Sequence, residues 1–469
     1  MDKLKIYHGL PYPLEMFIAS AKGFQLQSTR YNKNTDRLVE EALSREYWTE
    51  DQWKNWQETR LAVLLHHAGT NVPYYRAYWE IRRRNGDHAS MEYLENWPIL
   101  RKEELRSQED AFIAEGVDRK SLVLDHTSGT TGVPLKLWMS PEAVVEWYAL
   151  FEARWRKWYG VSRHDRWGIL GGQLVTPFDR TRPPFWVWNL GMNQLYLSTF
   201  HISPNFVPFY IEAIRTHKLV YLLGYASSLY SLARFALEQK LPIPALKAVI
   251  SNAEPLYHYQ RQTISQAFHS PVIDTYGQAE NVCASSECSE GHMHLWPEVG
   301  ITEIHSLSSD QPTALGEVGR LICTGLLNYA MPLIRYEVGD CAYFSGSKSI
   351  CSCGRTLPII GGIEGRTEDM IITRDGRHIE GPDTVFKAEW PIKEAQIIQE
   401  SLDLIRVCVV PASGYDSVTK KMLISGLHDR VGDMEVIIQE VAEIPRTKAG
   451  KRQVIVSKVD RKRVVQRDL

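Results

Sequence analysis

The stretch that most constrains this chain is a loop rich in hydroxyl groups and glycine, called the hydroxyl loop below. It contains Thr127, Ser128, Gly129, Thr130, Thr131 and Gly132, and Lys136 follows closely. Apolar runs at residues 121–124 and 135–139 flank the loop, and each run predicts a short strand. The spacing therefore predicts two strands joined as a hairpin.

The composition of the hydroxyl loop suits a polyphosphate ligand. Glycine lets the backbone turn and approach a ligand closely, while free N–H groups, hydroxyls and a cation neutralise phosphate oxygens. A flexible linker is the alternative, which we rank lower because strands frame the loop and Val-Pro-Leu-Lys closes it. A P-loop is excluded, because that motif requires Gly-Lys-Ser/Thr and here Val133 follows Gly132.

Length and charge bound the remaining possibilities. The chain has 469 residues, which is long for one core and predicts two or more domains. Its 54 basic and 56 acidic residues nearly balance, so neither a nucleic acid nor a membrane surface is expected as a partner. No apolar run reaches the roughly 20 residues that span a bilayer, and residues 1–6 lack the apolar core of a secretory signal. Seven cysteines suit a reducing compartment, so we expect a cytoplasmic protein without membrane insertion.

Residues 219–280 alternate between strand-like and helix-like patterns. Residues 219–225, 248–254 and 272–280 each combine an apolar run with a polar end, and helical periodicity separates them. This alternation predicts parallel strands with covering helices, which is an α/β fold. Ligands of such sheets bind beyond the carboxyl ends of the strands, so the polar ends are candidate site residues.

The hydroxyl loop resembles the nucleotide loop of adenylate-forming enzymes, the superfamily of acyl-CoA synthetases, peptide-synthetase adenylation domains and luciferases. Further stretches downstream resemble motifs of this superfamily, in the same order along the chain. The resemblance spans nearly the whole sequence. It implies a large ATP- and acyl-binding domain over residues 1–365, with a helical lead-in over 1–100, and a small mobile α/β domain over 366–469.

By this resemblance, residues at the ends of two predicted strands bind the nucleotide: Asn252, Ala253, Glu254, Thr275, Tyr276 and Gly277. The first three would border the adenine, and Tyr276 would stack on it. Thr275 and Glu280 would reach the phosphates and Mg²⁺, a hard cation that carboxylate oxygens suit. Taken alone, Glu280 is more typical of a charge at a helix N-terminus.

Residues 331–340 end in Gly339 and Asp340, which places a carboxylate at the tip of a predicted strand. A carboxylate there can accept hydrogen bonds from both hydroxyls of a ribose. The stretch is similar to the "RYxxGD" motif of the superfamily, which implies that Asp340 binds the ribose. An aspartate in an ordinary turn is the alternative.

Residues 182–189 are unusually aromatic, and their pattern resembles CapK-like members of the phenylacetate–CoA ligase branch. Four residues are candidates for the acyl pocket: Trp186, His201, Tyr225 and Gln278. For any single aromatic core packing is favoured, whereas the group together is a candidate pocket wall, and His201 is equally consistent with core or pocket. An aromatic pocket favours an apolar or aryl acyl group.

Two pairs of metal-ligand residues lie about sixty positions apart. Cys288 and His294 form one pair, and Cys351 and Cys353 form the other. Three thiolates and one imidazole make a tetrahedral set for structural zinc, with His292 as the rival to His294 and unbound thiols as the alternative. The other cysteines lie mostly in apolar runs and are expected in the core: Cys283, Cys323, Cys341 and Cys408.

Residues 363–371 resemble the interdomain hinge of the superfamily. Arg366 would face the phosphates, and either Glu368 or Asp369 would be the pivot. Residues 444–452 resemble the "PRTxxGK" stretch, which makes Lys451 the adenylation lysine rather than Lys448. The resemblance gives Lys451, Glu280 and Arg366 catalytic roles.

The resemblance implies a reaction with two halves. ATP activates a carboxylic acid as an acyl-adenylate with release of pyrophosphate, and an acceptor then takes the acyl group. CoA is the expected acceptor, which would make the chain an acid–thiol ligase. A carrier-protein thiol stays open, and so does an amine, which would make it an amide-forming ligase of polysaccharide or natural-product biosynthesis. A catalytically inactive nucleotide-binding scaffold is the last alternative. Expected cofactors are ATP, Mg²⁺ and structural Zn²⁺, with CoA added if it is the acceptor. The oligomeric state stays open between monomer and homodimer.

Overall fold

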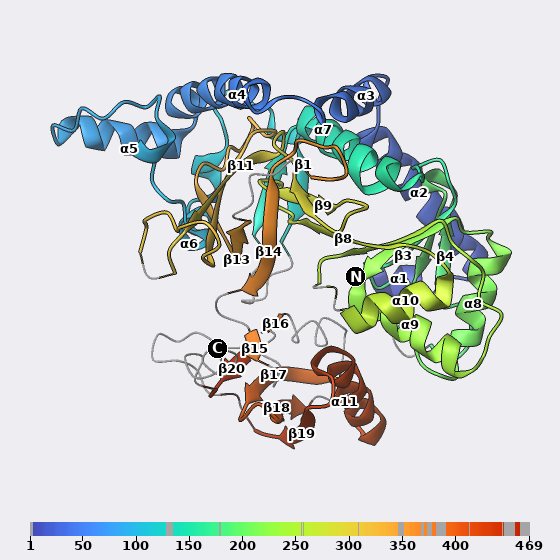
Figure 1. Ribbon diagram of the computed structural model, residues 1–469. Coiled ribbons are helices and arrows are strands. Elements are labelled where there is room, and N and C mark those ends of the chain that lie inside the picture. Colours follow the sequence, from blue (N-terminus) through green and yellow to red (C-terminus); the bar gives the residue numbers. More distant parts are fainter. Residues whose placement is uncertain are drawn as a thin grey trace.

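The computed structural model of the chain describes residues 3–127, 135–177, 180–254, 256, 258–307, 309–345, 351–366, 370–372, 378–380, 391–411, 413–442, 444 and 455–459. One long sheet runs through the larger part of the molecule, and a smaller sheet follows near the C-terminal end (Figure 1). Helices cover both, so the predicted α/β fold class is confirmed.

The N-terminal segment is helical as far as residue 84. It comprises α1 (Lys3–His8), α2 (Tyr12–Arg30), α3 (Thr35–Arg45), α4 (Glu50–Asn71) and α5 (Pro73–Arg84). Thr49 starts α4 through a capping box, in which Gln52 N donates to Thr49 Oγ1 at 3.3 Å and Thr49 N donates to Gln52 Oε1 at 2.8 Å. Leu64 of α4 and Tyr75 of α5 are fully buried in the core beneath these helices, so the segment packs on the body of the protein.

The long sheet has twelve strands among the described residues, in the order β11-β12-β13-β14-β10-β9-β8-β7-β6-β3-β5-β4. Its strands are β3 (Trp167–Leu170), β4 (Trp186–Asn189), β5 (Gln194–Leu197), β6 (Tyr221–Tyr225), β7 (Ala248–Asn252), β8 (Val272–Gly277), β9 (Ala284–Glu287), β10 (Met293–Leu295), β11 (Gly300–His305), β12 (Gly319–Gly325), β13 (Tyr336–Phe344) and β14 (Ile359–Arg366). The pairs β5–β3, β3–β6, β6–β7 and β7–β8 are parallel, as the alternation of strands and helices predicts. From β8 to β11 every pair is antiparallel.

Helices cover both faces of the parallel half. On β6, Leu222 packs into a core with α8 (Val207–Thr216), α9 (Ala226–Glu238) and α10 (His258–Phe268). Its neighbours Tyr221 and Leu223 face the opposite core, which contains α7 (Pro141–Phe151) and α3. Successive residues of a strand point to opposite faces, so burial on both sides explains the nearly continuous apolar sequence of these strands.

Short elements complete the larger part of the chain. They are η1 (Leu94–Asn96), α6 (Lys102–Ser107), η2 (Glu109–Phe112), η3 (Arg119–Ser121), the π-helical turn η4 (Glu152–Arg156), η5 (Lys157–Tyr159) and η6 (Leu190–Met192). Strands β1 (Val123–His126) and β2 (Lys136–Met139) pair antiparallel on either side of the hydroxyl loop. The pairing agrees with the predicted hairpin, and residues 128–134 of the loop lie outside the described part of the chain.

The C-terminal part has a sheet and a core of its own. Its sheet has the order β19-β18-β17-β20, with β17 (Ile392–Gln399), β18 (Leu404–Pro411), β19 (Glu435–Glu440) and β20 (Ile455–Ser457). Helix α11 (Ser417–Val431) contributes Leu423 and Leu427 to the core of this part. A short pair, β15 (Met370–Ile372) and β16 (His378–Glu380), lies between this sheet and the end of β14 (Figure 1). The domain boundary after residue 365 stays a prediction, and β14 runs one residue beyond it.

Among the described helices, none combines the length and the hydropathy that crossing a membrane requires.

A buried ion pair ties the helical layer to the sheet. Glu298 accepts two hydrogen bonds from the Arg154 guanidinium, at 2.7 and 2.8 Å, and a third from Arg45 Nε at 3.1 Å. Burial alone would raise the pKa of Glu298, but Arg154 and Arg45 hold it below its ordinary value. The Glu298 carboxylate is therefore charged, and both of its oxygens accept hydrogen bonds from arginine side chains.

We expect Glu298→Ala to lower the free energy of unfolding by about 3–5 kcal/mol, because it leaves the Arg154 charge buried without its main partner. Urea denaturation measures this loss. The matched control is Glu212→Ala, which breaks an exposed pair with Arg215 and should leave stability unchanged. Equal stability of the two variants would contradict a structural role for the Glu298 pair.

Candidate active site

Strands β6, β7 and β8 bring their carboxyl ends to one edge of the sheet. Tyr225, the last residue of β6, is in register with Asn252, the last residue of β7, and β8 ends at Gly277. Ala253 follows with φ of 62°, a left-handed conformation that is uncommon for a residue with a side chain. The edge where predicted adenine-side residues gather is therefore the edge at which α/β sheets bind ligands.

The phenol of Tyr276 is hydrogen-bonded to Asp340. Tyr276 Oη donates to Asp340 Oδ2 at 2.6 Å, which links the end of β8 to β13. Burial, and next the charge of Asp340, raises the pKa of Tyr276 well above its ordinary value, so the phenol keeps its proton. Tyr276 was expected to stack on adenine, and this contact adds that it orients the carboxylate expected to bind the ribose.

Glu280 lies in the tight turn that joins β8 to β9. Tyr336 Oη donates to Glu280 Oε1 at 2.9 Å, and Lys102 Nζ lies 3.6 Å from the same oxygen. The Glu280 side chain is only 5 % exposed. A carboxylate oxygen is a suitable ligand for Mg²⁺, so the donor chemistry fits the predicted role. Neither Tyr336 nor Lys102 was predicted as a site residue.

Strand β13 therefore meets the end of β8 at two places. Tyr336 starts β13 and contacts Glu280, and Asp340, four residues on, contacts Tyr276. Four residues of a strand cover about 13 Å. Asp340 is also in register with Arg366 of β14, of which the structure describes the backbone alone.

Other predicted nucleotide residues take part in local structure. The Thr275 hydroxyl is buried and donates to the carbonyl of Ser251 at 2.6 Å, so its proton is used within the sheet. Thr127 accepts a hydrogen bond from Leu135 N at 3.0 Å, which closes the base of the hydroxyl loop. Lys136 Nζ lies 3.4 Å from Glu109 Oε2, and its side chain is half-exposed.

Several predicted residues lie outside the described part of the chain: Ser128, Gly129, Thr130, Thr131, Gly132, Glu368, Asp369 and Lys451. Their roles stay predictions.

Two acyl-pocket candidates make contacts that favour the packing alternative. Trp186 lies on edge strand β4, with its ring 6.2 Å from that of Tyr210. His201 is buried, stacks on Phe185 at 4.9 Å, and shares a hydrogen bond with Ser198 at 2.8 Å through Nδ1. Strand β4 is also five positions from β8 in the sheet. The remaining candidates, Tyr225 and Gln278, lie at or directly after the carboxyl ends of β6 and β8.

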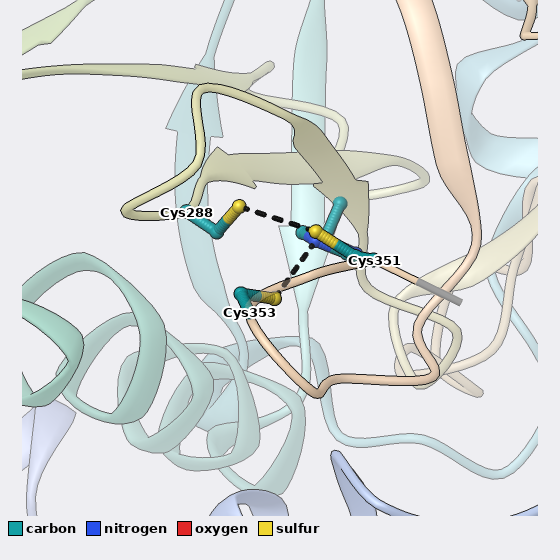
Figure 2. Close-up of side chains that lie close together, drawn as sticks. Cys288, Cys351 and Cys353 are labelled. Carbon is teal, nitrogen blue, oxygen red and sulfur yellow. Dashed lines mark hydrogen bonds between the residues drawn. The ribbon is translucent and has the colours of Figure 1, made fainter. Parts of the chain in front are cut away.

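A second cluster lies in the antiparallel half of the sheet. Cys288, His294, Cys351 and Cys353 each offer one ligand atom, and these atoms lie within 4.8 Å of one another. Cys288 Sγ is 3.7 Å from Cys351 Sγ, and Cys353 Sγ is 3.5 Å from His294 Nε2. Figure 2 shows the three thiols converging from two segments of the chain. Zinc–sulfur bonds of 2.3 Å in a tetrahedron place two sulfurs about 3.8 Å apart, so the arrangement fits zinc.

The hydrogen bonds of His294 distinguish it from its rival His292. His294 is fully buried, and its Nδ1 is hydrogen-bonded to the Leu357 carbonyl at 2.9 Å, which directs Nε2 toward the thiols. Burial lowers its pKa, so the imidazole is neutral, as a ligand must be. His292 Nδ1 lies 3.2 Å from Cys351 Sγ, outside the set of four ligand atoms.

Two tight turns present the thiols. Cys288 directly follows β9, and Gly291 N donates to its carbonyl at 3.0 Å in the turn to β10. Gly354 N donates to the Cys351 carbonyl at 2.9 Å in the segment before β14. Both glycines have positive φ, of 77° and 82°, which only glycine adopts without strain. The cluster thus joins the β9–β10 hairpin to the start of β14.

Comparisons with known proteins agree with this architecture. The family model described as the CapK C-terminal domain matches residues 371–458. Protein CapK of Staphylococcus aureus is 23 % identical over 461 residues, which cover 97 % of this chain and 99 % of that protein. Phenylacetate-coenzyme A ligase of Escherichia coli is 26 % identical over 340 residues, which cover 69 % of this chain and 73 % of the ligase.

A solved structure shares the fold. The crystal structure of 2-hydroxyisobutyryl-CoA ligase in complex with 2-HIB-AMP and CoA superposes with a TM-score of 0.56 and 20 % identity, covering 90 % of this chain and 93 % of that one. The alignment with CapK runs almost from end to end, and the described strands reproduce the fold of an adenylate-forming enzyme. The chain is therefore similar along almost its whole length to CapK, and over about two thirds of its length to a phenylacetate-coenzyme A ligase, in agreement with the predicted resemblance to the CapK-like and phenylacetate–CoA ligase branch of adenylate-forming enzymes.

Proposed function

We propose that this AMP-forming ligase activates a carboxylic acid as an acyl-adenylate and then transfers the acyl group to the thiol of CoA. The observation that carries the proposal is the partly buried contact of Tyr276 with Asp340, which lies near a second contact, that of Glu280 in the turn after β8 with Tyr336 of β13. The relatives named above include CoA ligases, and one solved relative holds both an acyl-adenylate and CoA.

The residues at this edge suit the first half-reaction. Asp340 can accept hydrogen bonds from the two ribose hydroxyls, while Tyr276 fixes the orientation of its carboxylate. Glu280 would hold Mg²⁺, which neutralises phosphate charge when bound. A carboxylate oxygen of the substrate then bonds to the α-phosphorus as the bond to the β-phosphate oxygen breaks, and pyrophosphate leaves. No proton moves in this step, so alignment and charge neutralisation are what the protein supplies.

The hydroxyl loop, Lys136, Arg366 and Lys451 complete the proposed set around the phosphates. Asn252, Ala253 and Glu254 would border the adenine at the end of β7, with Gly277 at the end of β8. Glu368 or Asp369 would be the pivot between the two parts of the chain. Tyr225 and Gln278 are the acyl-pocket candidates that lie at the nucleotide edge.

The acid and the acceptor can be identified in one series. Pyrophosphate exchange over a panel of aliphatic and aryl carboxylic acids should reveal one class that supports exchange, with Asp340→Asn as the inactive control. The best acid is then tested with CoA and with amines. Thioester formation supports the proposal, and amide formation without thioester replaces the thiol acceptor with an amine. A wild-type enzyme without exchange for any acid would contradict activation itself.

We expect Lys451→Ala to lose acyl-adenylate formation by about 10²–10³-fold, because it removes a cation from the site where negative charge builds. The lysine is distant in sequence from the nucleotide edge, so the C-terminal part must bring it there. The mobile small domain that the resemblance implies would do so for the first half-reaction only. Transfer from a supplied acyl-adenylate to CoA should therefore keep its wild-type rate. Lys448→Ala is the matched control, and equal loss of both half-reactions in Lys451→Ala would contradict the two-step use of this lysine.

We also propose that Cys288, His294, Cys351 and Cys353 hold one structural zinc ion. The proposal is supported by the four donor atoms, which suit a closed tetrahedral site. Burial raises the pKa of Cys351 to about 12, so a proton would leave this thiol when a metal binds. The ion would fasten the β9–β10 hairpin to the start of β14.

Metal analysis of the purified protein should find one zinc per chain. The double variant Cys351→Ser, Cys353→Ser should lose the metal and unfold at a lower temperature, whereas Cys408→Ser, in the C-terminal sheet, should keep the metal. Wild-type protein without stoichiometric zinc, or a double variant of unchanged stability, would contradict the site.

A further inference from the structure

Lys102 is brought to the site by a segment that pairs with β13. Leu100 N donates to the Arg335 carbonyl at 2.9 Å, and Glu337 N donates to the Leu100 carbonyl at 2.9 Å. This short parallel contact places residue 100 beside Tyr336. Lys102 follows as the first residue of α6, and its position is therefore set by backbone hydrogen bonds to the strand that also carries Asp340.

The ammonium of Lys102 forms an ion pair with Glu280 but no short hydrogen bond to it. Its distance of 3.6 Å from Glu280 Oε1 is that of an ion pair without a short hydrogen bond. The same oxygen already accepts a hydrogen bond from Tyr336 Oη at 2.9 Å. Glu280 is the sole ionic partner that the described residues give Lys102. Its side chain is only 24 % exposed, so this lysine is held inside the structure rather than extended into water.

We propose that Lys102 contacts the β- and γ-phosphates of ATP and then the leaving pyrophosphate, beside the metal ion that Glu280 would hold. This inference rests on the proposed function and adds a substrate-contacting residue to it. In the structure, the negative charge of Glu280 balances the positive charge of Lys102. A divalent cation at Glu280 would repel that ammonium, and the polyphosphate that arrives with the cation is the anion that can receive it.

The chemical role follows from this placement. When the substrate carboxylate bonds to the α-phosphorus, the bond between the α-phosphorus and the bridging oxygen breaks, and that oxygen keeps the electron pair. Lys102 stays protonated throughout and stabilises the charge that accumulates on the pyrophosphate. It has no part in the second half-reaction, because pyrophosphate has then left.

The neighbouring Arg101 offers a matched control. It is also a cation paired with a carboxylate, since Arg101 Nε lies 3.8 Å from Glu337 Oε2. Its side chain is 57 % exposed, and Glu337 also pairs with Arg320 at 2.8 Å. Removing Arg101 changes the charge of the segment by the same amount as removing Lys102, without touching Glu280.

The test compares two nucleotides that differ in their β- and γ-phosphates. Calorimetric titration with ATP and Mg²⁺, and separately with AMP, gives dissociation constants for the wild type, Lys102→Ala, Lys102→Arg and Arg101→Ala. In Lys102→Ala the dissociation constant of ATP should rise by about tenfold or more, and that of AMP should stay within about twofold. Lys102→Arg should recover most of the ATP affinity, and Arg101→Ala should match the wild type for both nucleotides.

Each other outcome has a definite meaning. Equal weakening of ATP and AMP in Lys102→Ala would show that the lysine merely holds Glu280 in place, and unchanged ATP binding would also overturn the inference. Wild-type protein that binds neither nucleotide would contradict the proposed function instead. Half-reactions give a second readout: Lys102→Ala should slow acyl-adenylate formation and leave transfer from a supplied acyl-adenylate unchanged.

Discussion

The candidate site depends on the way β8 is paired. Strand β8 has a parallel neighbour, β7, on one side and an antiparallel neighbour, β9, on the other. The chain must therefore reverse at once after β8, through a turn in which Asn281 has φ of 51° and its N–H donates to the Gln278 carbonyl at 3.1 Å. This reversal holds Glu280 at the edge where the parallel strands end. If β8 had parallel neighbours on both sides, the residues after Gly277 would leave along a crossover connection.

Partly buried polar contacts then hold the side chains at this edge of the sheet. One pair joins Tyr276 of β8 to Asp340 of β13, and the other joins Glu280, in the turn after β8, to Tyr336 of β13. Strands β8 and β13 are not adjacent in the sheet. A hydrogen bond from a neutral phenol to a carboxylate is strong in a region with little water, and leaving either group without its partner is costly. The two contacts thus set the distance between the proposed ribose and metal positions before any ligand is bound.

The sequence was most informative where structure is local. The alternation over residues 219–280 predicted the parallel strands, because burial on both faces leaves a long apolar run followed by polar residues. The two pairs of metal-ligand residues predicted a common ligand set, and the four ligand atoms do lie close together.

Long-range pairing was beyond reach from one sequence. Nothing in the local pattern of residues 99–102 shows that they pair with the start of β13, more than two hundred residues away, and Lys102 was missed as a neighbour of Glu280 for this reason. The same limit applies to Trp186 and His201, because an aromatic stretch alone does not distinguish a pocket wall from a packed core. Their contacts with Tyr210 and Phe185 favour the core.

The pairing of strand β14 bears on how the C-terminal part of the chain could move. This strand is paired with β10 near its start and with β13 along most of its length, and the four-residue metal-ligand cluster lies just before it. Eight residues of strand span roughly 26 Å, so the pairing with β10 and β13 holds β14 in the large sheet over that length. If the C-terminal part rotates as the resemblance implies, the pairing of β14 with β13 up to Arg366 would keep this strand with the large sheet.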